Sequence, residues 1–210
     1  VYCFNEEKKH SGIFNGIMTA QCGEQPLPSY GCCDLGPIIL PKFVKYPFTD
    51  KAYFDFKAFN QAVHTQVRFL DNVLDASLWP LPEQYKESRN KRRIGVGFTG
   101  LANALAMCGE VYYKQGGLEL ANKIASTLRN EAYIASVELA KEKGAFPLFD
   151  ADKYLEEGTF ASRLPDSIKK QIRQHGIRNS HLLSVAPTGT VSLAFADNAS
   201  NGIEPPFSLA

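Results

Sequence analysis

The chain has 210 residues, of which 44% are apolar and 21% are charged, and its formal net charge is +1. This composition is typical of a globular protein with a core, and the near-neutral charge offers no basic surface for nucleic acid. No apolar run reaches the roughly 20 residues that a membrane-spanning helix needs. We therefore expect neither a nucleic-acid partner nor a membrane partner.

Five cysteines make an odd number at irregular spacing, which argues against the disulfide framework of a secreted protein and favours a reducing, cytoplasmic compartment. No C-x-x-C pair is present, so no metal site is expected. The chain starts at Val1 rather than Met and stops at Ala210 without a charged tail, and both ends are expected to be cuts within a longer protein. The cysteines are Cys3, Cys22, Cys32, Cys33 and Cys108.

Glycines and prolines crowd the first fifty residues, which predicts loops with short extended pieces at 12–19 and 35–40. A helix is predicted next, with Asp55 as its N-cap and with Pro80 and Pro82 ending it. The apolar stripe of this helix consists of Phe59, Val63, Val67, Leu70, Leu74 and Leu78.

Three more helices are predicted further along the chain. The second has an apolar face that begins at Phe98, and it stops at Gly109. The third carries an alanine-rich stripe from Leu118 to Leu139, and the fourth spans residues 166–175.

A strand is predicted at 180–186, broken by Pro187, and another short apolar run follows at 191–196. Strands that alternate with helices predict an α/β fold with a parallel sheet or a barrel.

Cys22 and Glu24 place a thiol and a carboxylate two residues apart in a loop rich in glycine and proline. In an extended segment such side chains point the same way, so both could face one substrate. A thiol can lose a hydrogen atom or a proton, and a carboxylate can take a proton from a substrate hydroxyl. Taken alone, this pattern is more often accidental than catalytic.

Residues 187–192 (Pro-Thr-Gly-Thr-Val-Ser) follow the last predicted strand. Glycine permits close backbone approach, and the hydroxyl and N–H groups suit an anion. No Walker lysine is present, so this is not an NTPase phosphate loop, and alone the pattern is that of a common polar turn.

Several strings, in order along the chain, resemble the catalytic subunit of ribonucleotide reductases, specifically the adenosylcobalamin-dependent (class II) type. The resemblance runs from about Gly12 onward, and so many ordered strings make it highly specific. The strings are residues 22–28 (Cys-Gly-Glu-Gln-Pro-Leu-Pro), 30–36, 90–97, 143–149, 175–180, 186–192 and 201–205.

This resemblance implies that residues 1–210 are part of a ten-stranded α/β barrel with a central finger loop. The finger loop would span about 20–34, a helical middle 55–176, and a phosphate loop 187–192. The implied reaction is the radical-based reduction of ribonucleoside di- or triphosphates to 2′-deoxyribonucleotides.

The resemblance also implies roles for single residues. Cys22 would carry the thiyl radical that abstracts the ribose 3′ hydrogen, and Glu24 would deprotonate the 3′ hydroxyl. Cys33 would supply reducing equivalents with a cysteine further upstream, and Cys32 is its nearby competitor. The implied substrate-binding residues are Ala20, Gln21, Gly23, Pro187, Thr188, Gly189, Thr190 and Val191.

Adenosylcobalamin is the implied cofactor, and a radical supplied by a metal-containing partner subunit is the rival. The implied partners are the ribonucleotide, the remainder of the same catalytic subunit, a thioredoxin-type reductant and further copies of the chain in a homo-oligomer. The isolated fragment is expected to be inactive.

One departure concerns the two residues before Cys22. The family usually has Asn-Pro there, with the asparagine bonding the ribose hydroxyls, whereas this chain has Ala20-Gln21. A lost hydrogen bond to a reacting group is worth about 1.5–3 kcal/mol, or roughly ten- to a hundredfold in rate. A non-catalytic nucleotide-binding fragment or paralogue is therefore the alternative.

A third hypothesis, a nicotinamide-dependent oxidoreductase, comes from residues 95–100, which spell G-x-G-x-x-G. Charged residues precede this string where the fingerprint needs a buried strand, so its glycines are expected to permit tight helix packing instead. The cluster Lys91-Arg92-Arg93 is expected to be solvated surface, and His64 to flank the first helix.

Overall fold

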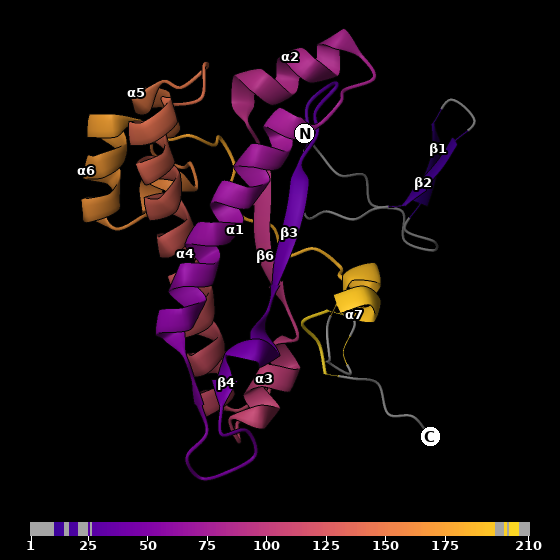
Figure 1. Ribbon diagram of the computed structural model, residues 1–210, viewed down its shortest axis with the longest axis vertical. Coiled ribbons are helices and arrows are strands. Elements are labelled where there is room, and N and C mark those ends of the chain that lie inside the picture. The colour runs from indigo at the N-terminus through magenta and orange to yellow at the C-terminus, as the bar shows by residue number, and fades with distance from the viewer. Residues whose placement is uncertain are drawn as a thin grey trace.

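The computed structural model describes residues 25, 27–195, 200 and 202–205, together with the backbone of two short strands at 11–14 and 17–20. Strands and helices alternate over this range, which confirms the mixed α/β class. Long helices lie along one side of a small parallel sheet (Figure 1). No helix in the described part is long and apolar enough to cross a membrane.

The sheet is a parallel pair, β3 (Asp34–Ile39) and β6 (Ile94–Thr99). A third segment follows the other edge of β6, where the Val96 N–H donates to the Leu182 carbonyl at 2.7 Å. The strand predicted at 35–40 is confirmed, but the one predicted at 180–186 is reduced to a single bridge between Leu183 and Val96.

Glycines let these three backbones approach closely. A Cβ atom on Gly97 would lie well inside contact distance of the Ser184 carbonyl oxygen, and one on Gly95 would collide with the Leu35 side chain. The expectation that these glycines permit helix packing is therefore wrong, because they serve strand packing. Phe98 also lies in β6 rather than at the head of a helix.

The helix α1 (Phe56–Ala76) forms as predicted. Its N-cap Asp55 accepts a hydrogen bond from the Ala58 N–H through Oδ1 at 3.0 Å. The apolar stripe is buried except at Leu78, which lies beyond the helix end and is 97% exposed. The helix α4 (Gln115–Lys143) packs along α1.

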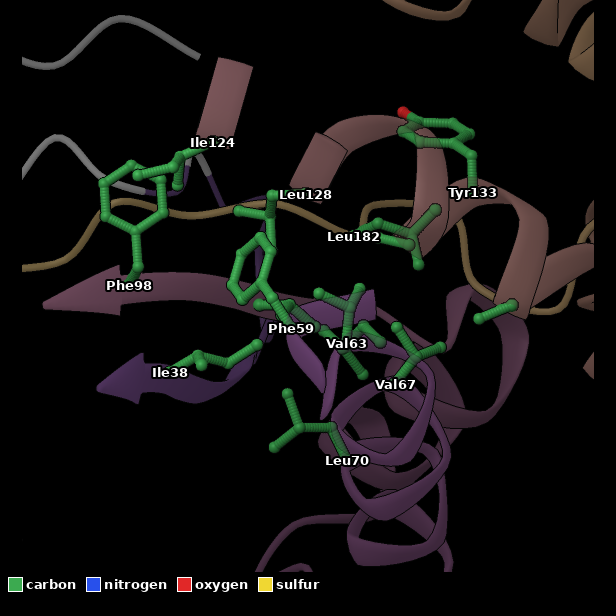
Figure 2. Packing of buried hydrophobic residues seen from close by; sticks show 14 of the residues in the cluster. Ile38, Phe59, Val63, Val67, Leu70, Phe98, Ile124, Leu128, Tyr133 and Leu182 are labelled. Atoms are coloured by element: carbon green, nitrogen blue, oxygen red, sulfur yellow. The ribbon is translucent and has the colours of Figure 1, made fainter. Parts of the chain in front are cut away.

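The core lies between α1, α4 and the sheet. Figure 2 shows Phe59 and Val63 of α1 close to Ile38 of β3 and Leu128 of α4. In the stripe predicted on α4, Leu118 and Ala125 are exposed, while a residue outside that stripe, Ile124, is buried.

The helix α2 (Pro82–Lys91) was not predicted, because Pro82 was interpreted as the end of the preceding helix. Proline is well suited to the first position of a helix, where its missing N–H would be unpaired anyway. The helix α2 is followed by its C-cap residue Arg92, whose backbone adopts left-handed geometry (φ 48°). The helix α3 (Leu101–Met107) begins only after Gly100 (φ 73°).

The fourth predicted helix is confirmed as α6 (Asp166–His175), and it ends at Gly176 as expected. The remaining elements are short: β1 (Ser11–Phe14), β2 (Ile17–Ala20), η1 (Leu40–Phe43), β4 (Val44–Lys45), β5 (Tyr53–Phe54), α5 (Ala151–Tyr154), η2 (Ala161–Arg163) and α7 (Gly189–Phe195).

The strands β1 and β2 form an antiparallel hairpin, with Ser11 beside Ala20 and Phe14 beside Ile17. Among the described elements, none outside the hairpin makes extensive contact with it. In Figure 1 the hairpin stands apart from β3 and β6.

The strands of the described part form three separate two-stranded sheets and no closed barrel.

Candidate functional site

The finger loop is only partly within the described residues. Residues 21–24, which include Gln21, Cys22, Gly23 and Glu24, lie outside them, and Ala20 is described only as the last residue of β2. The first described side chain after the gap is Gln25, whose Nε2 donates to the Leu183 carbonyl at 2.9 Å. The loop that follows Cys22 is thus attached to the segment beside β6.

Cys33 lies directly before the first residue of β3. Its Sγ is 3.9 Å from the Asp34 carbonyl oxygen. Across the sheet it faces Gly95, since a Cβ there would lie 3.3 Å from that sulfur and 2.8 Å from the Ser184 Cβ. Small residues on β6 therefore make the space that the thiol occupies.

Arg93 provides the positive charge beside the two adjacent cysteines. The Arg93 residue is only 6% exposed, so the prediction that it lies on the solvated surface is wrong. Burial lowers the pKa of its guanidinium, and Cys33, Glu87 and Cys32 act in the opposite direction. Arg93 is thus close enough to interact with a thiolate on either cysteine.

Cys32 is held as a neutral thiol by its surroundings. Burial is the largest effect and raises the pKa of Cys32. The charges of Asp34 and Glu87 raise this pKa further, whereas Arg93 lowers it. A thiol with a raised pKa is a weaker nucleophile at neutral pH.

Asp34 is a residue that the sequence did not single out. Burial raises its pKa, and its Oδ2 is buried with no hydrogen-bond partner among the described residues. In the sequence, only its position next to Cys33 in the string 30–36 indicated that Asp34 could lie near the site.

The predicted phosphate loop lies at the other end of β6. Thr188 is 2% exposed, and its Oγ1 is 2.5 Å from the Thr99 Oγ1 at the carboxyl end of the strand. The Thr188 carbonyl accepts the Ser192 N–H at 2.7 Å. Pro187 and Thr188 thus lead directly into α7, of which Gly189, Thr190 and Val191 are the first three residues.

The prediction for 187–196 was a polar turn followed by a short apolar run. The structure instead has the helix α7 from Gly189 to Phe195. The run is helical where it is described, and its apolar side chains Leu193 and Phe195 are 86% and 73% exposed.

Both parts of the implied site lie along one strand. Cys33 packs against Gly95 near the start of β6, and Thr188 is bonded to Thr99 at its end. Four residues of extended chain separate these positions by about 13 Å. The carboxyl ends of parallel strands are a common place for ligands in α/β folds.

A cavity of about 490 Å³ lies beside the finger-loop end of this strand. Tyr133, Phe160 and Gln25 contribute to its wall, and Tyr154 donates to the Ser180 carbonyl at 3.1 Å. Burial raises the pKa of Tyr133 to about 12 and that of Tyr154 well above its usual value. These phenols are therefore neutral hydrogen-bonding groups.

The charge of the cavity does not suit a diphosphate. Among the described residues, Lys153 is the one ammonium group that lines it, and residues 187–191 do not. His181 is neutral, because partial burial and the charges of Arg93 and Lys91 lower its pKa to about 4.

The chain matches a family model described as "Ribonucleotide reductase, barrel domain" over residues 5–210. It belongs to the ribonucleotide reductase barrel domain family.

Its relatives include two proteins named vitamin B12-dependent ribonucleoside-diphosphate reductase. The one from Thermoplasma acidophilum is 37% identical over 192 residues, covering 91% of this chain and 22% of the relative. The one from Mycobacterium tuberculosis is 35% identical over 192 residues, or 91% and 24% of the two chains. The chain thus spans less than a quarter of the length of these relatives.

A third relative has a different name. The ribonucleoside-diphosphate reductase large chain of Encephalitozoon cuniculi is 30% identical over 200 residues, covering 90% of this chain and 25% of the relative.

In this ribonucleotide reductase domain, two of the resembling strings meet at one buried carboxylate. Asp71 of α1 is fully buried, and its Oδ1 accepts from Arg92 Nε at 2.8 Å and from Asn179 Nδ2 at 3.0 Å. Arg92 comes from the string 90–97 and Asn179 from the string 175–180. Sequence reasoning expected Arg92 on the surface, whereas it is 3% exposed.

Further bonds complete this network. The Asn179 amide also donates to the Arg92 carbonyl at 3.1 Å, and its Oδ1 accepts from the Ser136 hydroxyl of α4 at 2.9 Å. Arg92 also donates to both carboxylate oxygens of Asp75, at 2.9 and 3.0 Å. The network therefore joins α1, α4 and the start of β6, and it positions Arg93 next in the chain.

His64 flanks the apolar stripe of α1 as expected, and its side chain is 32% exposed. Its Nε2 lies 2.8 Å from Glu131 and its Nδ1 3.4 Å from Glu138, both on α4.

Proposed function

We propose that the longer protein to which this chain belongs reduces ribonucleotides to 2′-deoxyribonucleotides by radical chemistry, with Cys22 as the thiyl site. The observation that carries the proposal is family membership over residues 5–210, together with the string from Cys22 to Gly36. Glu24 takes the proton of the 3′ hydroxyl as the 2′ hydroxyl leaves as water. Cys33 and an upstream thiol supply two electrons and two protons and become a disulfide.

The placement of Cys33 supports its role over that of Cys32. Cys33 packs against Gly95 and the segment at Ser184, next to the buried cation Arg93. The pKa of Cys32 is raised by burial and by two carboxylates. A neighbouring cation favours the reactive thiolate, and Arg93 interacts with Cys33 more strongly than with Cys32.

The substrate is proposed to lie along β6, with its ribose near the finger loop and its phosphates at residues 187–191. Support comes from Thr188, which Thr99 holds at the carboxyl end of the strand. The names of the relatives favour a diphosphate. Ala20, Gln21 and Gly23 remain proposed substrate contacts.

The remainder of the subunit is proposed to supply the missing strands of a ten-stranded barrel and the upstream cysteine. Support comes from the open edge of β3 in the described sheet and from the share of the relatives that the chain spans. Homo-oligomeric assembly, a thioredoxin-type reductant and a cytoplasmic location are proposed on the same family grounds.

Adenosylcobalamin is the proposed radical source, because two of the relatives are named vitamin B12-dependent. When bound, it would supply the radical that removes the hydrogen atom from a thiol. The described residues show no feature that assigns a cobalamin site. A metal-containing partner subunit is the rival source.

The full-length protein tests this proposal directly. Deoxyribonucleotide formation from a ribonucleoside diphosphate and a dithiol protein should require adenosylcobalamin or, for the rival, a second protein. Cys33→Ser should abolish multiple turnovers with the dithiol protein, whereas the matched neighbour Cys32→Ser should retain them. Equal activity of both variants would contradict the assignment of Cys33.

Ala20 favours one alternative, a non-catalytic nucleotide-binding paralogue. In that case the full-length protein would bind the nucleotide and form no deoxyribonucleotide under either radical source.

A further inference from the structure

The departure from the family pattern has a sharp boundary. From Cys22 onward the finger-loop string matches, whereas the two residues directly before it are Ala20-Gln21 in place of the expected Asn-Pro. A change confined to substrate contacts would not need to stop at one peptide bond. The first of the quoted family strings therefore begins directly after the bond between Gln21 and Cys22.

The backbone before this boundary forms a separate unit. The hairpin of β1 and β2 ends at Ala20, and it shares no sheet with β3 or β6. The strands are joined by Asn15-Gly16, the dipeptide most typical of a tight hairpin. In Figure 1 this hairpin stands away from the body of the domain.

Gln21 and Cys22, on the two sides of this bond, carry groups that can take part in acyl transfer. The side-chain amide of Gln21 can attack its own backbone carbonyl, because the product is an unstrained six-membered imide. Cys22 follows with a thiol that can hold an acyl group as a thioester. Both residues lie outside the described part, and it is their chemical identity, directly after the end of β2, that points to acyl transfer.

We propose that the segment ending at Gln21 is the last part of a self-excising element, which leaves the protein and joins an upstream segment to Cys22. The co-reactant is an activated acyl group, an ester or thioester, at the end of that upstream segment. The family match itself spans the hairpin, so its limits do not mark this boundary.

The chemistry balances in three steps without redox change or water. The Cys22 thiol attacks the upstream acyl carbon, its C–S bond forms, and the former thiol or hydroxyl carrier leaves with the proton. The Gln21 side-chain nitrogen then attacks the Gln21 carbonyl carbon, so that the Gln21–Cys22 peptide bond breaks and a proton passes to the Cys22 amine. That amine finally attacks the neighbouring thioester, which forms a peptide bond and restores the thiol.

Excision would explain the missing substrate contact. Excision removes Ala20 and Gln21, so in the mature protein the upstream residues joined to Cys22 would take the place of the substrate contacts proposed at these two positions. The reductase likeness leads us to expect Asn-Pro there. Only this last expectation rests on the proposed function; the bond chemistry does not.

The test is to express the complete reading frame and to determine the covalent structure around Cys22 by intact mass and peptide mapping. We expect the Cys22 peptide to begin with upstream residues. We also expect a released fragment whose C-terminal Gln21 is cyclised and therefore lighter by one water than the hydrolysed form. Wild-type protein that keeps the Gln21–Cys22 bond after prolonged incubation would overturn the proposal.

Three variants separate chemistry from folding. Gln21→Ala should abolish cleavage and leave the precursor, whereas Gln21→Asn should retain cleavage, because its shorter amide closes a five-membered imide. Gln174→Ala changes an exposed glutamine of α6 and should be processed like the wild type. Cleavage of Gln21→Ala at the wild-type rate would contradict the role of Gln21. Because the readout is covalent structure, a protein that is processed but does not reduce ribonucleotides would count only against the reductase proposal.

Discussion

At the scale of single residues, Arg93 connects the buried network to the proposed chemistry. Its neighbour Arg92 is held by two hydrogen-bonding carboxylates, Asp71 and Asp75, which compensate its charge. The charge of Arg93 reaches Cys32 and Cys33. Two adjacent arginines thus serve different purposes, one structural and one electrostatic.

We predict that Arg93→Met raises the pKa of Cys32 and slows alkylation of both adjacent thiols. Arg93 lowers the pKa of Cys32, so its removal leaves the raising effects of burial and of the carboxylates unopposed. Iodoacetamide labelling of the full-length protein between pH 7 and 9, read by peptide mapping, would measure the change. Arg173→Met, at an exposed arginine of α6, is the control. Unchanged labelling of Cys32 and Cys33 would contradict the account.

Asp71 carries a second prediction at this scale. Asp71→Ala removes the buried one of the two carboxylates that hold Arg92, and breaking a buried pair costs about 3–5 kcal/mol. Thermal unfolding of the full-length protein should therefore begin at a clearly lower temperature. Asp75→Ala is the matched control, because the side chain of Asp75 is 37% exposed and solvent can replace its contacts. Equal shifts for the two variants would show that the buried carboxylate is not the centre of the network.

At the scale of elements, the sequence predicted best where periodicity and capping act locally. The stripe and N-cap of α1 and the limits of α6 came directly from spacing. The string 94–99 was misassigned because its two glycines resemble a helix-packing pattern, and their use depends on Ser184 and Leu35, which are distant in sequence. The burial of Arg92 was missed for the same reason, since its partner Asp71 is 21 residues away.

The same reasoning limits what the sequence could say of the site. Cys33 was identified through a family string, but its neighbours Gly95 and Arg93 come from another strand, so their effect on the thiol could not be predicted. Thr188 was chosen for its hydroxyl, although that group is bonded to Thr99. The hydrogen bond therefore gives Thr188 a structural role that its residue type alone did not indicate.

Gly97 tests the close packing of β6 against the segment at Ser184. We predict that Gly97→Ala displaces that segment and destabilises the domain, because the added methyl group would overlap the Ser184 carbonyl. Gly189→Ala is the matched control for stability, since a Cβ there meets nothing within 4 Å. Hydrogen exchange of the Val96 and Ser184 amides would measure the effect. Slow exchange in Gly97→Ala, as in the wild type, would contradict the predicted displacement.

At the scale of the whole molecule, the buried cluster between α1, α4 and β6 forms the core of the described part. Within that part, β3 pairs with β6 along one edge and with no other described strand. Unpaired strand edges favour pairing with further strands. This agrees with the proposal that the remaining barrel closes around the finger loop.

The central claim is that Cys22 abstracts the 3′ hydrogen of a ribonucleotide. The most direct measurement is the rate of deoxyribonucleotide formation by the full-length protein with a substrate that carries deuterium at the 3′ carbon. The account predicts a slower rate with the deuterated substrate and no product from Cys22→Ser. Product formation by Cys22→Ser at the wild-type rate, with no isotope effect, would contradict it.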